Sequence, residues 1–459
     1  MDFSQQHVPR SAAETLREMA EAAEKVGYDF DTYGDGASLR AFEDRVAGLF
    51  GKEAGLFVAT GTMAQQNVLR CLTWGCDVQM NPKIYVHPTS HLIHQDCLRD
   101  GEAQGKVFTR RAATNLGEFD VVAMGQFDRV LQWRDLIVKF YLPGATVNAA
   151  VVLELPQRMN GGGTPSWDDL VEISTYLRGK RVKLHMDGAR LFEVLPYYGK
   201  PLEELAALFD TVYVSFYKGI GALASAMVLG PRDVLDAVRA QVSKRGGKLF
   251  TLGPLALSAE LAFDKSGAAD GAFAERFDRI KAAVAVVKAE AEASGVRVEF
   301  DPEEPQSAMV HCYLKGDRAE LERLHEKAKE RTGATLWNKF RGEGHKGAGW
   351  SYFEWSMGPA NAAFSDDDVR AAWAAFLDLC KVEHPLSCEP DPVEEVDPED
   401  SPEPLKMEAL KTLEQNMEAN AGLEDAAPPA PDGGGGGDGD AAAAPPDPPV
   451  AADDDAPVE

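Results

Sequence analysis

Three polar residues stand at regular intervals where short apolar runs end. They are Glu154, Asp187 and Lys218, and they are separated by 33 and 31 residues. In a parallel sheet the carboxyl ends of the strands share one edge, and ligands bind outside that edge. An aspartate there can keep a pyridine nitrogen protonated, and a lysine there can hold an aldehyde as a Schiff base. The spacing therefore predicts that these side chains act together on one ligand.

Small residues follow two of these side chains. Gly188 and Ala189 come after Asp187 and are followed by Arg190. Two glycines come shortly after Lys218, within the segment 215–221. Small residues let a flat ligand approach the backbone, and an arginine fork can bind a carboxylate in two places. Either motif alone is typical of a surface ion pair. Both together, in this order, favour pyridoxal phosphate chemistry.

A third motif precedes them in the segment 58–66. An apolar run ends at Thr60, Gly61 permits a tight approach, and a helix is expected to open at Thr62. Exposed backbone N–H groups and the helix dipole would suit a phosphate there. Strand–glycine–helix turns are common, so a purely structural turn stays open as the alternative.

The apolar pattern indicates which elements position these residues. Short apolar runs at 149–154, 182–186 and 211–216 alternate with amphipathic segments, which is typical of βαβ units and a mostly parallel sheet. After Pro254 we expect helices at 276–293 and 320–331, and the pattern ends near His384 after a last helix. Strand-like segments are expected at 296–300, 308–314, 334–340 and 351–355. We therefore expect an α/β fold with a large domain at 1–255, a smaller α+β domain at 256–385 and a tail at 386–459.

Composition assigns the chain to a class of proteins. The net charge is −27, but residues 388–459 carry 21 acidic and two basic residues, which leaves 53 against 45 upstream. The tail is rich in Pro, Gly, Ala and Asp, so we expect it to be disordered. Few bases disfavour nucleic-acid binding. No apolar run reaches 18 residues and the N-terminus lacks a signal pattern. Six scattered cysteines favour reduced thiols, and we expect a cytoplasmic protein.

The chain resembles the threonine aldolase and β-eliminating lyase family of fold-type-I pyridoxal phosphate enzymes. The resemblance spans about residues 30–380 and is carried by the segments 33–36, 49–54, 60–64, 187–190 and 215–221. It implies that Lys218 binds the cofactor covalently and that Asp187 contacts the pyridine nitrogen. It also implies Gly61 and Thr62 at the phosphate, and Arg190 at the cofactor or the substrate carboxylate. A small amino acid as substrate and a homodimer or homotetramer would follow.

The resemblance also implies a histidine stacked on the cofactor ring, and His91 after Ser90 fits that position. His87, His91 and His94 are close enough in sequence to suggest a metal site. However, Pro88 disrupts a helix that would join His87 to His91, and no catalytic glutamate accompanies them. We therefore expect His91 to stack on the ring with a catalytic role, and no metal.

Two departures separate this chain from the aldolases of the family. Gln157 stands where they carry a histidine that handles the substrate β-hydroxyl, and an amide cannot accept a proton near neutral pH. The late arginine expected for carboxylate recognition is absent from the segment 351–356. Gln157 is thus a candidate substrate-binding residue, and the sequence does not identify the substrate.

Several functions are compatible with these residues. We expect a lyase that cleaves a β-hydroxy-L-amino acid to glycine and an aldehyde, and the alternative is β-elimination from a β-substituted amino acid. A penicillin-binding hydrolase would need further motifs that are absent, although Ser215 and Lys218 have its Ser-x-x-Lys spacing. A non-catalytic scaffold would not need Lys218, Asp187 and Arg190 together.

Overall fold

The computed structural model describes residues 1–73, 82–94, 119–140, 149–268, 271–342, 344–384 and 388. The chain divides into two compact units, residues 1–390 and 391–459. The second unit lies outside the described residues, as does all of the expected tail at 386–459 except Cys388. Disorder of the tail therefore stays a prediction, and so does a domain boundary near residue 255.

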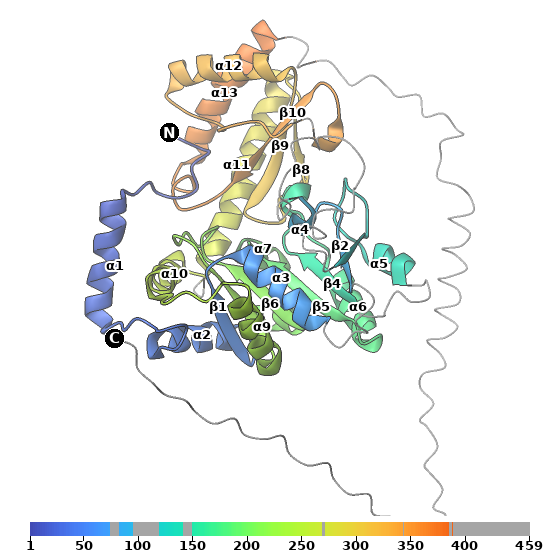
Figure 1. The fold of residues 1–459 in the computed structure, drawn as a ribbon. Helices are drawn as coiled ribbons and strands as arrows, with labels where there is room; N and C mark the ends of the chain where they lie inside the picture. The colour runs from blue at the N-terminus through green and yellow to red at the C-terminus, as the bar shows by residue number, and fades with distance from the viewer. Residues whose placement is uncertain are drawn as a thin grey trace, which may run out of the picture. The chain divides into compact units, whose positions relative to one another are not determined.

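A seven-stranded sheet forms the centre of the first part of the chain (Figure 1). Its strands, in spatial order, are β1 (Ala54–Val58), β7 (Ala226–Gly230), β6 (Thr211–Ser215), β5 (Lys183–Gly188), β4 (Ala149–Glu154), β2 (Lys83–Val86) and β3 (Asp120–Ala123). Only β7 runs against the others. The central strands are almost continuously apolar because helices cover both of their faces. The predicted mostly parallel sheet is confirmed.

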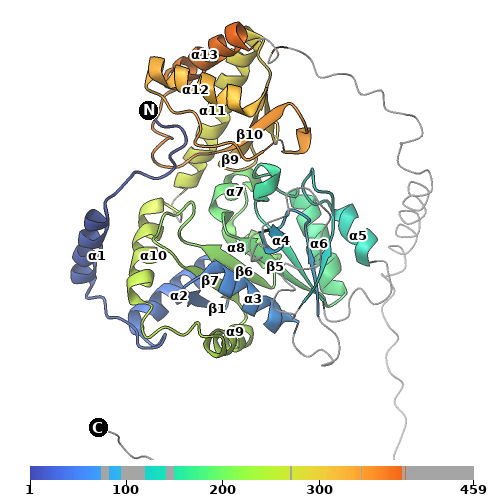
Figure 2. The ribbon, with the colours of Figure 1, turned by 45° about the horizontal axis from the view of Figure 1, so that its top comes forward.

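Two apolar clusters lie on the two faces of this sheet. One contains Leu153, Met186 and Val214 of alternating strand positions, and the other contains Val152 and Tyr213. Helices α3 (Gly61–Leu72) and α9 (Arg232–Lys244) cover the second cluster. The remaining helices of this region are α1 (Ala12–Val26), α2 (Ala37–Leu49), α4 (His91–His94), α5 (Trp133–Phe140), η2 (Arg158–Asn160), α6 (Trp167–Gly179), α7 (Leu191–Tyr198), α8 (Leu202–Ala207) and α10 (Gly253–Ser266). Helix α1 lies beside α10 (Figure 2).

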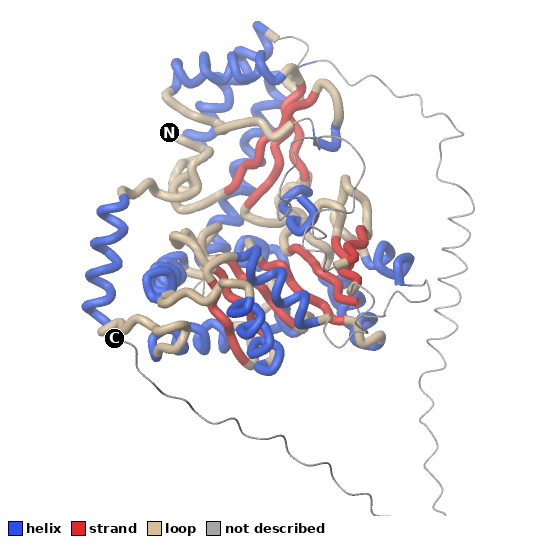
Figure 3. The backbone as a smooth tube through the Cα atoms, viewed as in Figure 1, coloured by secondary structure: helices blue, strands red, loops and turns tan. Residues whose placement is uncertain are grey.

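A second, antiparallel sheet of three strands follows (Figure 3). Its order is β10 (Trp350–Ser356), β9 (Met309–Lys315) and β8 (Val298–Asp301). Helices α11 (Ala272–Ser294), α12 (Arg318–Thr332) and α13 (Asp366–Glu383) pack on it, and η3 (Gly344–Lys346) precedes β10. A capping box of Ser365 and Asp368 starts α13. Phe3 joins this second core although it opens the chain.

One expectation about this region was wrong. The apolar segment 334–340 resembles a strand, yet only Thr335 forms a bridge, with Asp2. Its side chains Leu336, Trp337 and Phe340 fill the second core from irregular backbone. The apolar side chains of this segment are therefore a consequence of burial and not of strand pairing. Among the described residues, no helix is long and apolar enough to cross a membrane.

Candidate active site

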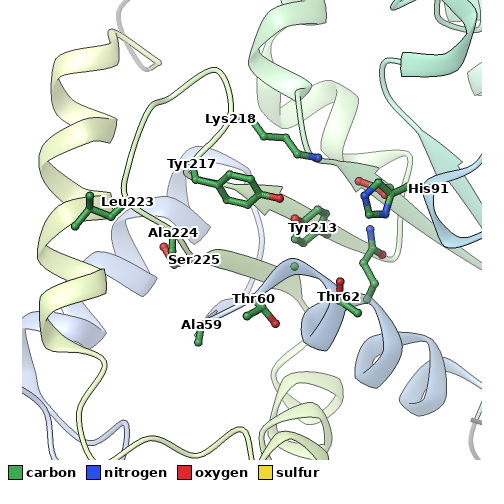
Figure 4. Close-up of a pocket in the computed structure, with 13 residues that line it drawn as sticks. Ala59, Thr60, Thr62, His91, Tyr213, Tyr217, Lys218, Leu223, Ala224 and Ser225 are labelled. Atoms are coloured by element: carbon green, nitrogen blue, oxygen red, sulfur yellow. The ribbon is translucent and has the colours of Figure 1, made fainter. Parts of the chain in front are cut away.

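A cavity of about 350 Å³ opens at the carboxyl edge of the large sheet (Figure 4). The side chains that line it come from β5, β6, α3, α4 and the segment after β6. They are Ala59, Thr60, Gly61, Thr62, Gln65, His91, Asp187, Tyr213, Tyr217, Lys218, Leu223, Ala224 and Ser225. Five of the seven predicted site residues thus meet in one cavity, and Arg190 and Gln157 are not among its lining residues.

Lys218 follows β6 and reaches into the cavity from above the sheet edge. Burial lowers the pKa of its amine from the usual value, against the opposing attraction of Asp187. A lysine with a lowered pKa is neutral more often near neutral pH. Lys218 is therefore prepared to attack a carbonyl carbon.

Asp187 lies in β5 directly beside Tyr213 of β6 and is almost completely buried. Its Oδ1 accepts a hydrogen bond of 3.1 Å from the backbone N–H of Ala189, which fixes the carboxylate at the cavity wall. The neighbouring strand brings Glu154 level with it. A buried carboxylate in this position suits a partner that carries a proton or a positive charge.

Glu154 is held by two backbone donors. One carboxylate oxygen accepts from His91 at 3.2 Å and the other from Arg158 at 3.1 Å. Burial and the nearby charge of Asp187 raise the pKa of Glu154 in spite of these donors. Its structural effect is clear, because it fixes the first residue of α4, and with it His91, at the cavity.

The start of α3 lies across the cavity from Lys218 (Figure 4). Thr60 caps the helix by accepting from the N–H of Met63 at 3.3 Å, so the first N–H groups point outward. Gly61 is required here, because a Cβ at this position would overlap the hydroxyl of Tyr213. The helix therefore approaches the sheet edge more closely than any other residue would allow.

Two buried hydroxyls lie close to this end of the sheet, at Ser225, which lines the cavity, and at Ser215, the last residue of β6, which does not. The Oγ atoms of Ser215 and Ser225 have no hydrogen-bond partner among the described residues. Buried polar atoms are normally paired, so two orphaned hydroxyls indicate an absent ligand with acceptor oxygens. Together with the helix start, they fit the phosphate of pyridoxal phosphate.

The other histidines have different surroundings. His87 is buried, its Nδ1 lies 2.7 Å from the Thr89 hydroxyl, and burial lowers its pKa to about 4. His94 closes the short helix that His91 opens. Within the described ranges, no group of three or more His, Cys, Asp or Glu is arranged to hold a metal.

Arg190 and Gln157 lie near the cavity without lining it. Arg190 donates to both oxygens of Glu193, at 3.0 and 3.3 Å, and its Nε has no partner in the described part of the chain. The Gln157 side chain is buried, and both of its amide atoms lack described partners. Each has unused hydrogen-bonding capacity.

Sequence reasoning missed several lining residues, of which Tyr213 and Ser225 are the most informative. Tyr213 was hidden in an apolar run, although alternation within 211–215 places it on the same face as the orphaned Ser215. Ser225 has a left-handed backbone with φ of 87°, which is unusual for a residue other than glycine. No sequence pattern indicated that strain.

Comparisons with known proteins agree with this geometry. The family model of the β-eliminating lyases matches residues 11–335. The chain belongs to the β-eliminating lyase family. The expected fold type is thereby confirmed, and the class is that of pyridoxal phosphate-dependent lyases.

Two solved structures and one curated protein show how similar its relatives are. A candidate L-allo-threonine aldolase of Listeria monocytogenes is 32% identical over 82% of this chain and 95% of its own, with a TM-score of 0.69. A candidate β-eliminating lyase/threonine aldolase of Exiguobacterium is 29% identical over 82% and 96%, with the same TM-score. An alanine racemase of Cochliobolus carbonum is 28% identical over 54% of this chain and 60% of its own. The chain spans less than two thirds of the length of the first curated relatives that it matches.

Proposed function

We propose that this protein uses pyridoxal phosphate to cleave the Cα–Cβ bond of a β-hydroxy-L-amino acid, giving glycine and an aldehyde. The observation that carries the proposal is the meeting of Lys218, Asp187 and His91 in one cavity with the start of α3. The family match and the aldolase relatives support it.

Different residues of the cavity would contact different parts of the cofactor. Gly61, Thr62 and Ser225 would hold the phosphate, His91 would pack on the ring, and Asp187 would keep the ring nitrogen protonated. Lys218 would hold the aldehyde carbon. When bound, pyridoxal phosphate withdraws electrons from the amino-acid Cα, so that a bond to that atom can break.

The protein's own groups must then move protons. The lowered pKa of Lys218 makes its amine a suitable proton acceptor beside the reacting carbon. Gln157 would donate or accept a hydrogen bond at the substrate side chain, and its unpartnered amide atoms leave both options available. Arg190 would bind the cofactor or the substrate carboxylate through its unpartnered Nε.

A β-elimination reaction is the second candidate. Gln157 favours it, because elimination of a β-leaving group needs no base at a β-hydroxyl, and an amide is a poor base. The same cofactor residues would serve, with Lys218 removing the Cα proton.

A homodimer or homotetramer forms part of the proposal. Phe30, Tyr33, Leu249 and Phe250 are exposed apolar residues, and the rings of Tyr33 and Phe250 meet at 5.3 Å. The backbone N–H of Tyr33 also donates to the carbonyl of Phe250. Such a patch is suited to a second copy of the chain.

Product analysis tests the proposed reaction. Purified protein saturated with pyridoxal phosphate is incubated with threonine, phenylserine and a β-substituted alanine. We expect glycine and an aldehyde from a β-hydroxy substrate. A keto acid with ammonia from the substituted alanine would favour elimination, and a protein that binds no cofactor would contradict both reactions.

A further inference from the structure

One carboxylate near the cavity faces two arginines. Glu354 of β10 accepts a hydrogen bond of 2.9 Å from Nη2 of Arg158 and another of 2.7 Å from Nη2 of Arg341. Among the described residues, no other carboxylate lies within ion-pair distance of either guanidinium. The group therefore carries one excess positive charge, and Glu354 itself is only 11% exposed.

The described neighbour His311 does not change this charge. His311 stands directly opposite Glu354 in the β9–β10 register, 4.0 Å from the carboxylate. Burial lowers the pKa of His311 to about 4, so the imidazole is neutral near neutral pH. The cluster thus lacks one anion.

Arg158 starts at the wall of the cavity. Its backbone N–H shares the Glu154 carboxylate with the backbone N–H of His91, which lines the cavity. From there its side chain extends to Glu354 in the second sheet, with 22% of its surface exposed. Arg158 is also close enough to Lys218 to lower the pKa of that amine. An anion beside Lys218 would therefore lie within the electrostatic range of Arg158.

The guanidinium of Arg158 has capacity to spare. Its Nη2 is directed to Glu354, and no described residue accepts from its Nη1, which is therefore available to a second carboxylate at the end of the guanidinium. Arg190 is less available, because the buried Glu193 already takes its Nη1. Strand β10, which has no arginine, supplies no other candidate.

We propose that Arg158 binds the α-carboxylate of the amino-acid substrate and that Glu354 is a positioning residue that holds its guanidinium. This inference rests on the proposed function, since it assumes that an amino acid occupies the cavity. It assigns the carboxylate to a residue of η2 and leaves Arg190 to the cofactor. A carboxylate would also neutralise the excess charge of the cluster.

Glycine and methylamine provide the test, because they differ only in the carboxylate. Each is titrated into cofactor-loaded protein, and its Kd is read from the change in the absorbance spectrum. In Arg158→Met we expect the Kd of glycine to rise about 10- to 100-fold, as for the loss of a charged hydrogen-bonded pair. The Kd of methylamine should change less than about twofold, and Arg158→Lys should recover part of the glycine affinity.

Arg232→Met is the matched control, since Arg232 is an exposed arginine that pairs with Glu53 outside this cluster. We expect its glycine Kd to stay within about threefold of wild type. Equal losses for glycine and methylamine in Arg158→Met, or no loss for glycine, would overturn the inference alone. A wild type that takes up no pyridoxal phosphate would overturn the proposed function and this inference with it.

Discussion

The two ends of the candidate site differ in how their polar groups are satisfied. At the α3 end, the hydroxyls of Ser215 and Ser225 are buried and have no described partner. At the other end of the candidate site, outside the lining of the cavity, the arginines already have protein carboxylates, Arg190 with Glu193 and Arg158 with Glu354. The hydroxyl donors at the α3 end therefore lack acceptors, whereas protein carboxylates already accept from the arginines.

This difference indicates which end binds the cofactor and which end binds the substrate. Unsatisfied donors at a helix start suit any phosphate ester, and the family match covers that part of the chain. Arg190 depends on Glu193 at the start of the same helix, and Arg158 depends on Glu354, which joins η2 to β10. We infer that the α3 end serves the cofactor phosphate and that Arg158, at the arginine end, serves the carboxylate of the amino acid.

Lys218 would both bind the cofactor and accept a proton from the amino acid, so its removal should have the largest effect. We expect Lys218→Ala to lose covalent cofactor binding and to lower turnover by about 10⁴-fold or more. The absorbance spectrum of the cofactor-saturated variant and its turnover are the measurements. Lys200→Ala, a surface lysine near Glu204, is the control. An unchanged spectrum in Lys218→Ala would mean that another amine binds the aldehyde.

The lowered pKa of Lys218 adds a pH dependence to the same measurement. The neutral amine attacks the aldehyde, and a lowered pKa keeps it neutral down to a lower pH than an exposed lysine. The rate of cofactor binding should therefore stay high below the usual lysine pKa and fall only as pH drops through the lowered one. A rate that falls already near the usual value would contradict this assignment.

Asp187 should follow, because it acts on the ring but not on its attachment. Its charge is needed most when negative charge develops on the ring during bond cleavage. We expect Asp187→Asn to retain cofactor and to lose about 10²- to 10⁴-fold in kcat. Spectra and kcat measured together separate the two effects, and an undiminished kcat would show that another group protonates the ring.

The cofactor end was largely predictable from the sequence, for a local reason. Asp187 and Lys218 stand at or just after the ends of strands. The apolar runs of the sequence show where those strands end. Tyr213 could not be assigned in the same way. Its role depends on its register beside Asp187 and on the approach of Gly61, both of which are tertiary facts.

At the arginine end Arg190 was predicted, but the pairing of Arg158 with Glu354 could not be, because it joins distant residues. Arg158 and Glu354 lie 196 positions apart. The three strands of the second sheet were predicted, but a fourth was wrongly expected at 334–340, which is as apolar as a strand. Burial without hydrogen-bond pairing produces the same pattern, and β9 already pairs with β8 and β10.

Gly61→Ala tests the cofactor end alone. The added methyl group would overlap the Tyr213 hydroxyl, so the helix start must shift away from the sheet edge. We expect the Kd of pyridoxal phosphate to rise about 10- to 100-fold, measured by spectral titration. Gly179→Ala, where nothing lies within 4 Å, should leave it unchanged.

Tyr213→Phe sharpens that test. Removal of the hydroxyl relieves the overlap, so Gly61→Ala should cost less in the Tyr213→Phe background than in wild type. Equal costs in the two backgrounds would show that the helix start tolerates the methyl group for another reason. The coupling between the two changes is the quantity to compare.

Gln157→His should have the smallest effect and is the only change expected to increase an activity. The buried amide has no described partners, so the pocket already accommodates a polar group of similar reach. A histidine could accept the proton of a β-hydroxyl, and general bases contribute about 10²- to 10⁴-fold when well placed. Because an introduced histidine is not positioned by its neighbours, we expect only about a tenfold gain in threonine cleavage, less than a well-placed base would add. Glycine formation from threonine and phenylserine is measured for wild type, Gln157→His and Gln157→Met, which matches the side chain in size but cannot accept a proton. A wild type that already cleaves threonine rapidly, or an equal gain in Gln157→Met, would show that residue 157 does not set the substrate.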